Sequence, residues 1–262
     1  MKQLVLFGLT IFITAQAVAQ KFQFNYNTDF QNILTRTIDA NDNLSYFTLL
    51  KRFKANDPAL TNFEVLALLI GFTGNTHFKP YSYLQTERKI QMLNSGGNFK
   101  AALGLSDSLL QVVPVSPQAL FEKSYAHFML DEKDSSQYFM WKFQKIMETM
   151  ALTGDGLSAE TDIFSLGPAD GQIYIRGFLL GDIGIMGSGR DKHGNFMDIL
   201  TAITKDQSTG QTKSETMYFQ IEHAVKSMHD KPGSDKRRMK GHKRKKERAK
   251  LEIEDNGPVI KN

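Results

Sequence analysis

The amino-acid sequence predicts an α+β fold, in which tetratricopeptide-like antiparallel helix pairs precede a small antiparallel β-containing half. Two observations lead to this fold class. Apolar residues recur at helical spacing up to about Met150, and glycine clusters and alternating segments follow it. We expect a signal peptide at residues 1–19, the helical half at 20–150, the β-containing half at 151–225 and a basic, disordered tail at 226–262. The two halves should pack as one cooperative unit, because no long linker separates them.

The first nineteen residues have the three parts of a cleavable signal peptide. Lys2 is followed by an apolar run over residues 4–13, and Ala17 and Ala19 give the small-x-small pattern of a cleavage site. The run is about ten residues long, too short to cross a bilayer of ~30 Å as a helix. We therefore expect an exported, soluble protein in the periplasm or outside the cell. The chain has no cysteine, which excludes disulfides and thiolate nucleophiles.

Helical periodicity begins near Thr28. One apolar stripe runs through residues 30–38, and a second recurs every three residues over 44–53. Thr61 and Glu64 have the spacing of a capping box, which predicts a central, nearly all-apolar helix over residues 63–72. Four more helices are predicted over residues 83–93, 99–113, 118–130 and 135–150.

One spacing within these helices is typical of a tetratricopeptide repeat. If Gly97 is position 15, then Phe99 is position 17, Ala102 is position 20 and Pro114 is position 32. The small residue would allow two helices to approach closely, and the proline would end the second helix. An unrelated helical bundle is an equally good interpretation, and both predict antiparallel helix pairs.

The β-containing half begins with turn clusters at residues 153–156 and 167–171. Residues 198–204 and 216–221 read as the two strands of a hairpin around Thr209-Gly210. Met217, Phe219 and Ile221 should face inward, because they alternate with polar neighbours. Residues 161–166 are expected to add a third strand, and residues 174–180 suit a helix or a strand equally well.

Five sequence blocks resemble a family of secreted bacterial domains of unknown function, found mostly in Bacteroidetes. The blocks are residues 46–54, 69–73, 154–161, 198–200 and 218–221. The resemblance runs from about Phe24 to Ala224 and implies a location in the periplasm or on the outer surface. It implies no activity and no catalytic residues. Residues 181–195 depart from it, because they are richer in glycine and charge.

Residues 187–195 are the strongest local candidate for a binding loop, because glycines, two cations, a carboxylate and an imidazole lie within nine positions. Glycine-loop N–H groups can hold an anion, although the spacing fits neither a phosphate-binding loop nor a dinucleotide fingerprint. The other interpretation is a plain connecting loop. The candidate ligand-binding residues are Asp155, Arg176, Ser188, Arg190, Asp191, His193 and Asn195. No histidine pattern predicts a metal site, and no motif predicts a cofactor or a nucleophile.

Charge is distributed unevenly, because residues 226–250 contain 12 Lys or Arg and the rest of the chain is mildly acidic. This tail could hold the protein to an anionic surface such as lipopolysaccharide or acidic glycan, or it could be a solvated appendage. No aromatic residue lies among the charges, which disfavours specific nucleic-acid binding. The candidate surface-binding residues are Lys236, Arg237, Arg238, Lys243, Arg244, Lys245, Lys246 and Arg248.

We interpret the sequence as that of a non-catalytic envelope binding or protein-interaction domain, whose partner is an unknown protein or envelope component. It would use the helical groove or the glycine-rich face. The alternative is a hydrolase-like enzyme with Asp191, His193 and Asp198 near its site. A third hypothesis is a structural protein held by its tail. Convergence of Asp155, Arg176, Asp191 and His193 on one cleft would favour the enzyme, and their dispersal would favour binding.

Overall fold

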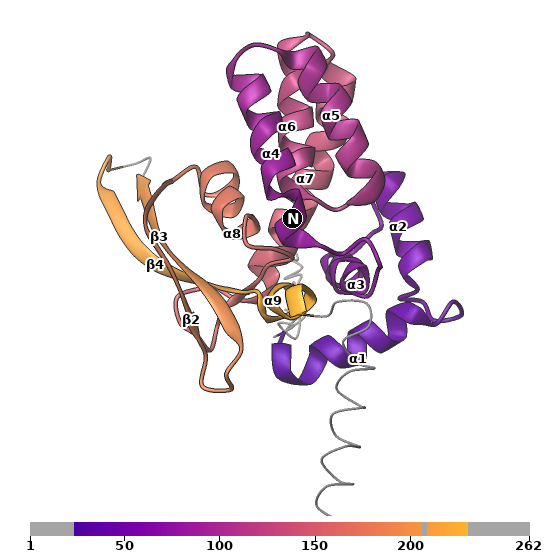
Figure 1. The fold of residues 1–262 in the computed structure, drawn as a ribbon, viewed down its shortest axis with the longest axis vertical. Coiled ribbons are helices and arrows are strands. Elements are labelled where there is room, and N and C mark those ends of the chain that lie inside the picture. The colour runs from indigo at the N-terminus through magenta and orange to yellow at the C-terminus, as the bar shows by residue number, and fades with distance from the viewer. Residues whose placement is uncertain (1–23, 206–208, 230–262) are drawn as a thin grey trace, which may run out of the picture.

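The computed structural model describes residues 24–205 and 209–229, so the predicted signal peptide and the basic cluster at 236–250 lie outside the described residues. Helices α1–α7 occupy one side of the molecule, and a twisted sheet lies beside them (Figure 1). The helices are α1 (Tyr26–Ile38), α2 (Tyr46–Lys54), α3 (Asn62–Thr73), α4 (Pro80–Ser95), α5 (Phe99–Val112), α6 (Pro117–Met129), α7 (Lys133–Thr153), α8 (Asp170–Ile173), the π-helix η1 (Tyr174–Phe178) and α9 (Glu222–His229).

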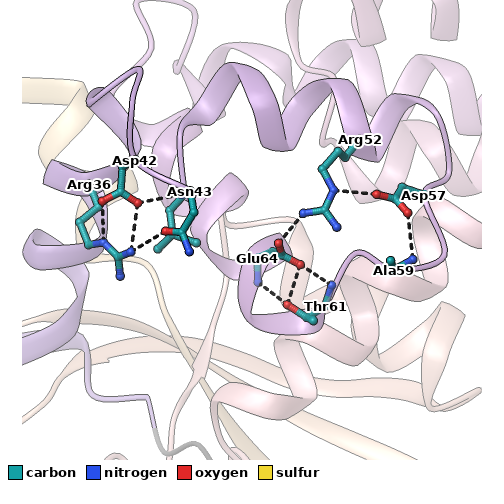
Figure 2. A network of polar contacts seen from close by, with 9 residues as sticks. Arg36, Asp42, Asn43, Arg52, Asp57, Ala59, Thr61 and Glu64 are labelled. Atoms are coloured by element: carbon teal, nitrogen blue, oxygen red, sulfur yellow. Dashed lines mark hydrogen bonds and ion pairs between the residues drawn. The ribbon is translucent and has the colours of Figure 1, made fainter.

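The predicted capping box begins α3. The Thr61 hydroxyl accepts from the Glu64 N–H, and the Glu64 carboxylate accepts from the Thr61 N–H at 2.8 Å. Glu64 also pairs with Arg52 of α2, which in turn holds Asp57 at 2.6 Å (Figure 2). These contacts fix α2 against the start of α3, which is almost completely buried, as expected from its apolar sequence.

A second arginine ties α1 to the loop that leads into α2. Arg36 donates to Asp42 at 2.9 and 3.0 Å and to Asn43 at 2.7 Å (Figure 2). Asp42 in turn accepts from the Leu44 N–H, so the loop folds around this carboxylate. The network explains why the helical stripe at residues 30–38 stops and a new helix starts within a few residues.

Helices α4 to α7 pack as consecutive helix pairs, which confirms the predicted arrangement of the helical half (Figure 1). Ala102, the expected small residue of the repeat, is fully buried. Helix α4 starts at Pro80 rather than at residue 83, because proline lacks the N–H that the first turn leaves unpaired. Every other predicted helix of this half is present within three residues at each end.

The sheet has the order β1-β4-β3-β2. Its strands are β1 (Ile163–Phe164), β2 (Asp182–Arg190), β3 (Phe196–Lys205) and β4 (Thr212–Gln220). Strands β3 and β4 form the predicted hairpin, with Met217 and Phe219 buried on the face that packs inward. The sheet is mixed rather than wholly antiparallel, because β1 pairs in parallel with β4.

The predicted loop at residues 187–195 is wrong for its first four residues. Residues 187–190 belong to the edge strand β2, where Gly187 pairs with Ile199 and Arg190 pairs with Phe196. Glycine has a low strand propensity, but hydrogen bonds from β3 override this preference. Only residues 191–195 form the turn that joins the two strands.

The glycine-aspartate-glycine block at residues 154–156 joins α7 to the sheet. A side chain on Gly154 would collide with the carbonyl oxygens of Thr161 and Asp162, and Gly156 has a φ of +71°. The Gly156 backbone bonds to the Thr161 carbonyl at 2.7 Å and to the Tyr218 N–H at 2.8 Å. The block is therefore a tight connection that only glycine can make.

One hydrophobic core runs through both halves, from Leu49 and Phe72 in the helices to Phe164 and Phe219 in the sheet. Helix α8 fills the space between the sheet and the α4–α7 bundle (Figure 1). The ambiguous residues 174–180 form mainly the π-helix η1, directly after α8. Among the described residues, no helix is both long and apolar enough to cross a membrane.

Candidate functional site

An interhelical groove lies where the helical half meets the α8–η1 segment. It has a narrow end with a volume of about 30 Å³ and a wide end of about 440 Å³. Leu84, Glu87, Pro168 and Ala169 line both ends, so the two spaces are adjacent. π-Helices such as η1 occur frequently at functional sites. The charged side chains of this groove are therefore the first candidates for a binding site.

The narrow end contains two buried carboxyl groups in an apolar setting. Glu87 of α4 accepts from the Ser116 hydroxyl at 2.7 Å, and Asp170 of α8 accepts from the Gly167 N–H at 2.9 Å. Burial raises the pKa of Glu87, while burial and the nearby Glu87 raise the pKa of Asp170 to about 8. Neither carboxyl pairs with a basic side chain in the part of the chain that the structure describes.

The wide end has the opposite charge at its rim. Arg88 of α4 and Arg176 of η1 line it, and both are exposed. Within the described ranges, neither guanidinium makes an ion pair or a side-chain hydrogen bond with a carboxylate. Glu122 also lines the wide end, and it accepts from Gln118 at 2.8 Å and from Asn94 at 2.7 Å. Burial raises the pKa of Glu122, while these two amides lower it.

A second polar space, the α1 cleft, lies between the start of α1 and the turn that joins β2 to β3. It has a volume of about 350 Å³ and is lined by Asp162, Asp191 and His193, among others. Asp162 accepts from the Gln220 side chain at 3.0 Å. Burial and the nearby Asp191 raise the pKa of Asp162 to about 7.

Asp191 organises the turn beneath this cleft. Its carboxylate accepts from the His193 N–H at 2.8 Å, from the Asn195 N–H at 2.8 Å and from the Asn195 side chain at 2.7 Å. These donors lower the pKa of Asp191 although partial burial opposes them. Asn195 also donates to Asn27 of α1 at 2.9 Å, so the turn is fastened to the first helix. Lys192 pairs with Glu160 at 3.6 Å.

The candidate ligand-binding residues predicted from the sequence lie at separate places in the structure. Arg176 lines the groove, whereas Asp191 and His193 line the α1 cleft and Asn195 lies beside it. Asp155 accepts from the Thr161 hydroxyl at 2.6 Å in the connection after α7. Asp198 interacts electrostatically with Asp170 and Tyr81 and does not line the cleft that holds Asp191.

Ser188 and Arg190 lie on the edge strand β2 rather than in a loop. Arg190 stacks over the Phe196 ring at 5.2 Å and lies 3.8 Å from Glu222 of α9. Its guanidinium donates to the Gly194 carbonyl at 2.5 Å, which closes the turn over residues 191–195. Arg190 is thus engaged by the protein itself and holds the turn in place.

Sequence reasoning missed Glu87 and Asp170. Glu87 lies on the stripe that Leu84 and Ile90 define at a spacing of three, where an acidic residue is out of pattern. That mismatch is the signal that could have identified it. Asp170 was hidden in a cluster of glycine and proline, which reads as an ordinary turn.

Apolar walls around a few polar groups, as in this groove, are typical of sites for small molecules or peptide segments. No group of His, Cys, Asp and Glu in the described residues has an arrangement that could hold a metal ion. The α1 cleft is more polar, and its Asp191, Lys192 and Glu160 side chains have partners within the protein, whereas Asp162 accepts from Gln220.

Residues 31–229 match the model of a protein family, the domain of unknown function DUF4919, whereas no curated protein and no solved structure matches the chain. The match confirms the resemblance to a family of domains of unknown function. The bacterial source and secretion that the resemblance implies stay predictions. All residues that line the groove fall inside the match, whereas the α1 cleft begins at Phe24, outside it. The chain belongs to the DUF4919 family of domains of unknown function.

Proposed function

We propose that the protein is a non-catalytic binding domain and that its ligand occupies the interhelical groove. The observation that carries this proposal is the set of ionisable groups that the groove leaves without ionic partners among the described residues: Arg88, Arg176, Glu87 and Asp170. Burial disfavours the charged form of Glu87 and Asp170, and a cation bound beside them would stabilise that form. The dispersal of Asp155, Arg176, Asp191 and His193 also supports binding rather than catalysis.

A groove-filling substitution tests this proposal. Gln91 is exposed on α4 and lines the wide end, so Gln91→Trp should fill the groove without disturbing the core. Lys89→Trp is the matched control, because Lys89 is exposed on the same helix and does not line the groove. Peptides, oligosaccharides and nucleotides are screened for a rise in Tm. We expect the active compounds to stabilise the wild type and Lys89→Trp, but not Gln91→Trp.

The hydrolase-like alternative rests on the α1 cleft, where two carboxyl groups have pKa values displaced in opposite directions. Asp191→Asn separates the two functions. Loss of ligand binding in Asp191→Asn with retention in Gln91→Trp would place the site in the α1 cleft. Cleavage of the compound, detected by mass spectrometry, would contradict the non-catalytic function. A screen in which no compound stabilises the wild type would count against the groove as a ligand site.

We also propose export, on the basis of the three-part N-terminus at residues 1–19. The intact mass of the secreted protein should correspond to a chain that starts at Gln20. Retention of Met1 in protein from the cell envelope would contradict this expectation. An exported location would make envelope components, or a protein held there, the partners available to the groove.

The basic tail is proposed to attach the protein to lipopolysaccharide or another anionic surface. Residues 226–229 belong to α9, so a truncation that tests the tail has to follow His229. We expect the full chain to bind anionic vesicles at low salt, at about 1 kcal/mol per basic residue near the surface, and the truncated chain to lose this binding. Binding should weaken with added salt because the Debye length shrinks. Equal retention of both chains at low salt would identify a solvated appendage.

A further inference from the structure

The narrow end of the groove has the size and walls of a pocket for one small polar group. Its volume of about 30 Å³ exceeds the roughly 10–15 Å³ that a single water molecule needs, so a group of the size of water or ammonium can enter it. Phe72, Phe78, Leu84 and Leu166 form much of its wall. A group that enters this end therefore leaves water and must find its polar partners in the protein.

The polar partners at this end are acceptors. Glu87 of α4 and Asp170 of α8 both line the pocket, and both residues are more than nine-tenths buried. The Ser116 hydroxyl reaches one oxygen of Glu87, and the backbone of residues 166 and 167 donates to Asp170. A carboxyl group has about four acceptor positions, so most of this capacity is unused. Burial raises the pKa of both groups, and the nearby Glu87 raises the pKa of Asp170 further.

The opposite end supplies donors. Arg88 and Arg176 come from α4 and η1, and no described carboxylate neutralises either guanidinium. A planar guanidinium fork fits a carboxylate with two parallel hydrogen bonds. Leu84, Phe121 and Ile173 line the wide end and offer contact area for an uncharged chain, and Leu84 also lines the narrow end.

We propose that the interhelical groove binds a short peptide whose ammonium group lies between Glu87 and Asp170 and whose carboxylate meets Arg88 and Arg176. The inference rests on the proposed function of the groove and names its ligand class. The carboxylates of Glu87 and Asp170 repel each other, and an ammonium group between them would form favourable ionic contacts with both. A neutral ligand would leave both arginines unpaired, and an anion at the narrow end would be repelled by both acids.

A ladder of alanine peptides tests the charge arrangement, because alanine adds length without adding other polar groups. Di- to penta-alanine are compared with the N-acetylated and the C-amidated form of each length by isothermal titration calorimetry. We expect one length to bind best, and we expect either modification to weaken its Kd by about tenfold or more. Binding at pH 7 should release a proton from Asp170, which makes the measured enthalpy depend on the ionisation enthalpy of the buffer.

Two substitutions assign the ends, each with a matched control. Glu87→Gln keeps the shape and should weaken the free and the C-amidated peptide alike, whereas Glu148→Gln, on the exposed face of α7, should change nothing. Arg176→Ala should weaken the free peptide and leave the already weaker C-amidated form unchanged. Lys89→Ala is its control. Circular dichroism and Tm establish that each variant is folded.

The experiments distinguish a wrong ligand class from a wrong binding site. Equal binding of free and N-acetylated peptides, or a binding enthalpy independent of the buffer, would overturn the ammonium pocket. If no alanine peptide binds but Gln91→Trp still blocks another compound, the groove remains a binding site and the zwitterionic ligand is wrong. If peptides bind equally well to the wild type and Gln91→Trp, both the ligand class and the groove are wrong.

Discussion

The groove contains two buried carboxyl groups, whereas Asp162 and Asp191 in the α1 cleft are half-buried, and Asp191 is stabilised in a way that the groove carboxyls are not. In the cleft, Asp191 accepts three hydrogen bonds from its own turn, and Lys192 pairs with Glu160. In the groove, Asp170 and Glu87 have only neutral donors and no cation among the described residues. The two spaces therefore differ in how many hydrogen-bond and ionic partners the protein provides for their charged side chains.

This difference separates structure from function. Polar groups that satisfy one another hold a fold together and gain little from a ligand, because the ligand would have to replace good hydrogen bonds. Buried ionisable groups that remain without ionic partners raise the energy of the free protein in their charged form, and a ligand of opposite charge stabilises that form. The cleft is thus the better candidate for a structural element, although it contains the residues that the sequence singled out.

The largest expected effect concerns the pH dependence of stability. The pKa of Asp170 is about 8 in the folded protein, against 3.8 for an ordinary aspartic acid side chain, so the folded chain binds the extra proton between these values. The stability from protonated Asp170 is fully present below about pH 4 and is lost as the pH rises towards 8, on the order of 4–5 kcal/mol. Urea denaturation of the wild type and Asp170→Asn across this range measures the difference.

The difference in stability between the wild type and Asp170→Asn at each pH gives the contribution of the Asp170 carboxyl group alone. His223, whose pKa burial lowers to about 3, and Lys142, whose pKa burial lowers to about 7, titrate in both proteins and cancel in the difference. Asp162 in the cleft should contribute a smaller change of the same sign, because its pKa is raised only to about 7. Parallel stability curves for the wild type and Asp170→Asn would show that Asp170 is not protonated in the folded groove.

A smaller effect is expected from the carboxylate that organises the cleft. Asp191→Ala removes the acceptor of three hydrogen bonds and leaves the N–H groups of His193 and Asn195 without it, which should cost about 2–3 kcal/mol. Chemical denaturation measures this change. The groove control Glu87→Gln keeps its acceptor for Ser116 and should not destabilise the protein. Equal losses in the two variants would remove the distinction between the two regions.

Much of the fold was predictable because its helices and hairpin have local signals. The Thr61 capping box and the alternation around Phe219 specify their elements without help from distant residues. Strand β2 was not predictable in this way, because Gly187 and its glycine neighbours acquire strand structure only by pairing with β3. The groove required tertiary structure altogether, since Glu87 and Asp170 lie 83 positions apart in the sequence.

The smallest expected changes in the free energy of unfolding are those of exposed charged residues, one from the α1 cleft and one from the groove. Lys192 and Glu160 are more than half exposed, so Lys192→Ala should change the free energy of unfolding by less than about 0.5 kcal/mol. Arg176→Ala should be equally neutral, because Arg176 has no ionic partner to lose in the described residues.

The two variants should diverge only when ligand is present. Arg176→Ala is expected to reduce the rise in Tm that a groove ligand produces, and Lys192→Ala is expected to keep it in full. A titration of Tm against ligand concentration for both variants makes the comparison at matched stability. If ligand raised the Tm of Arg176→Ala but not that of Lys192→Ala, the ligand would bind in the α1 cleft. In that case the presence of hydrogen-bond and ionic partners within the protein would not distinguish a structural site from a functional one.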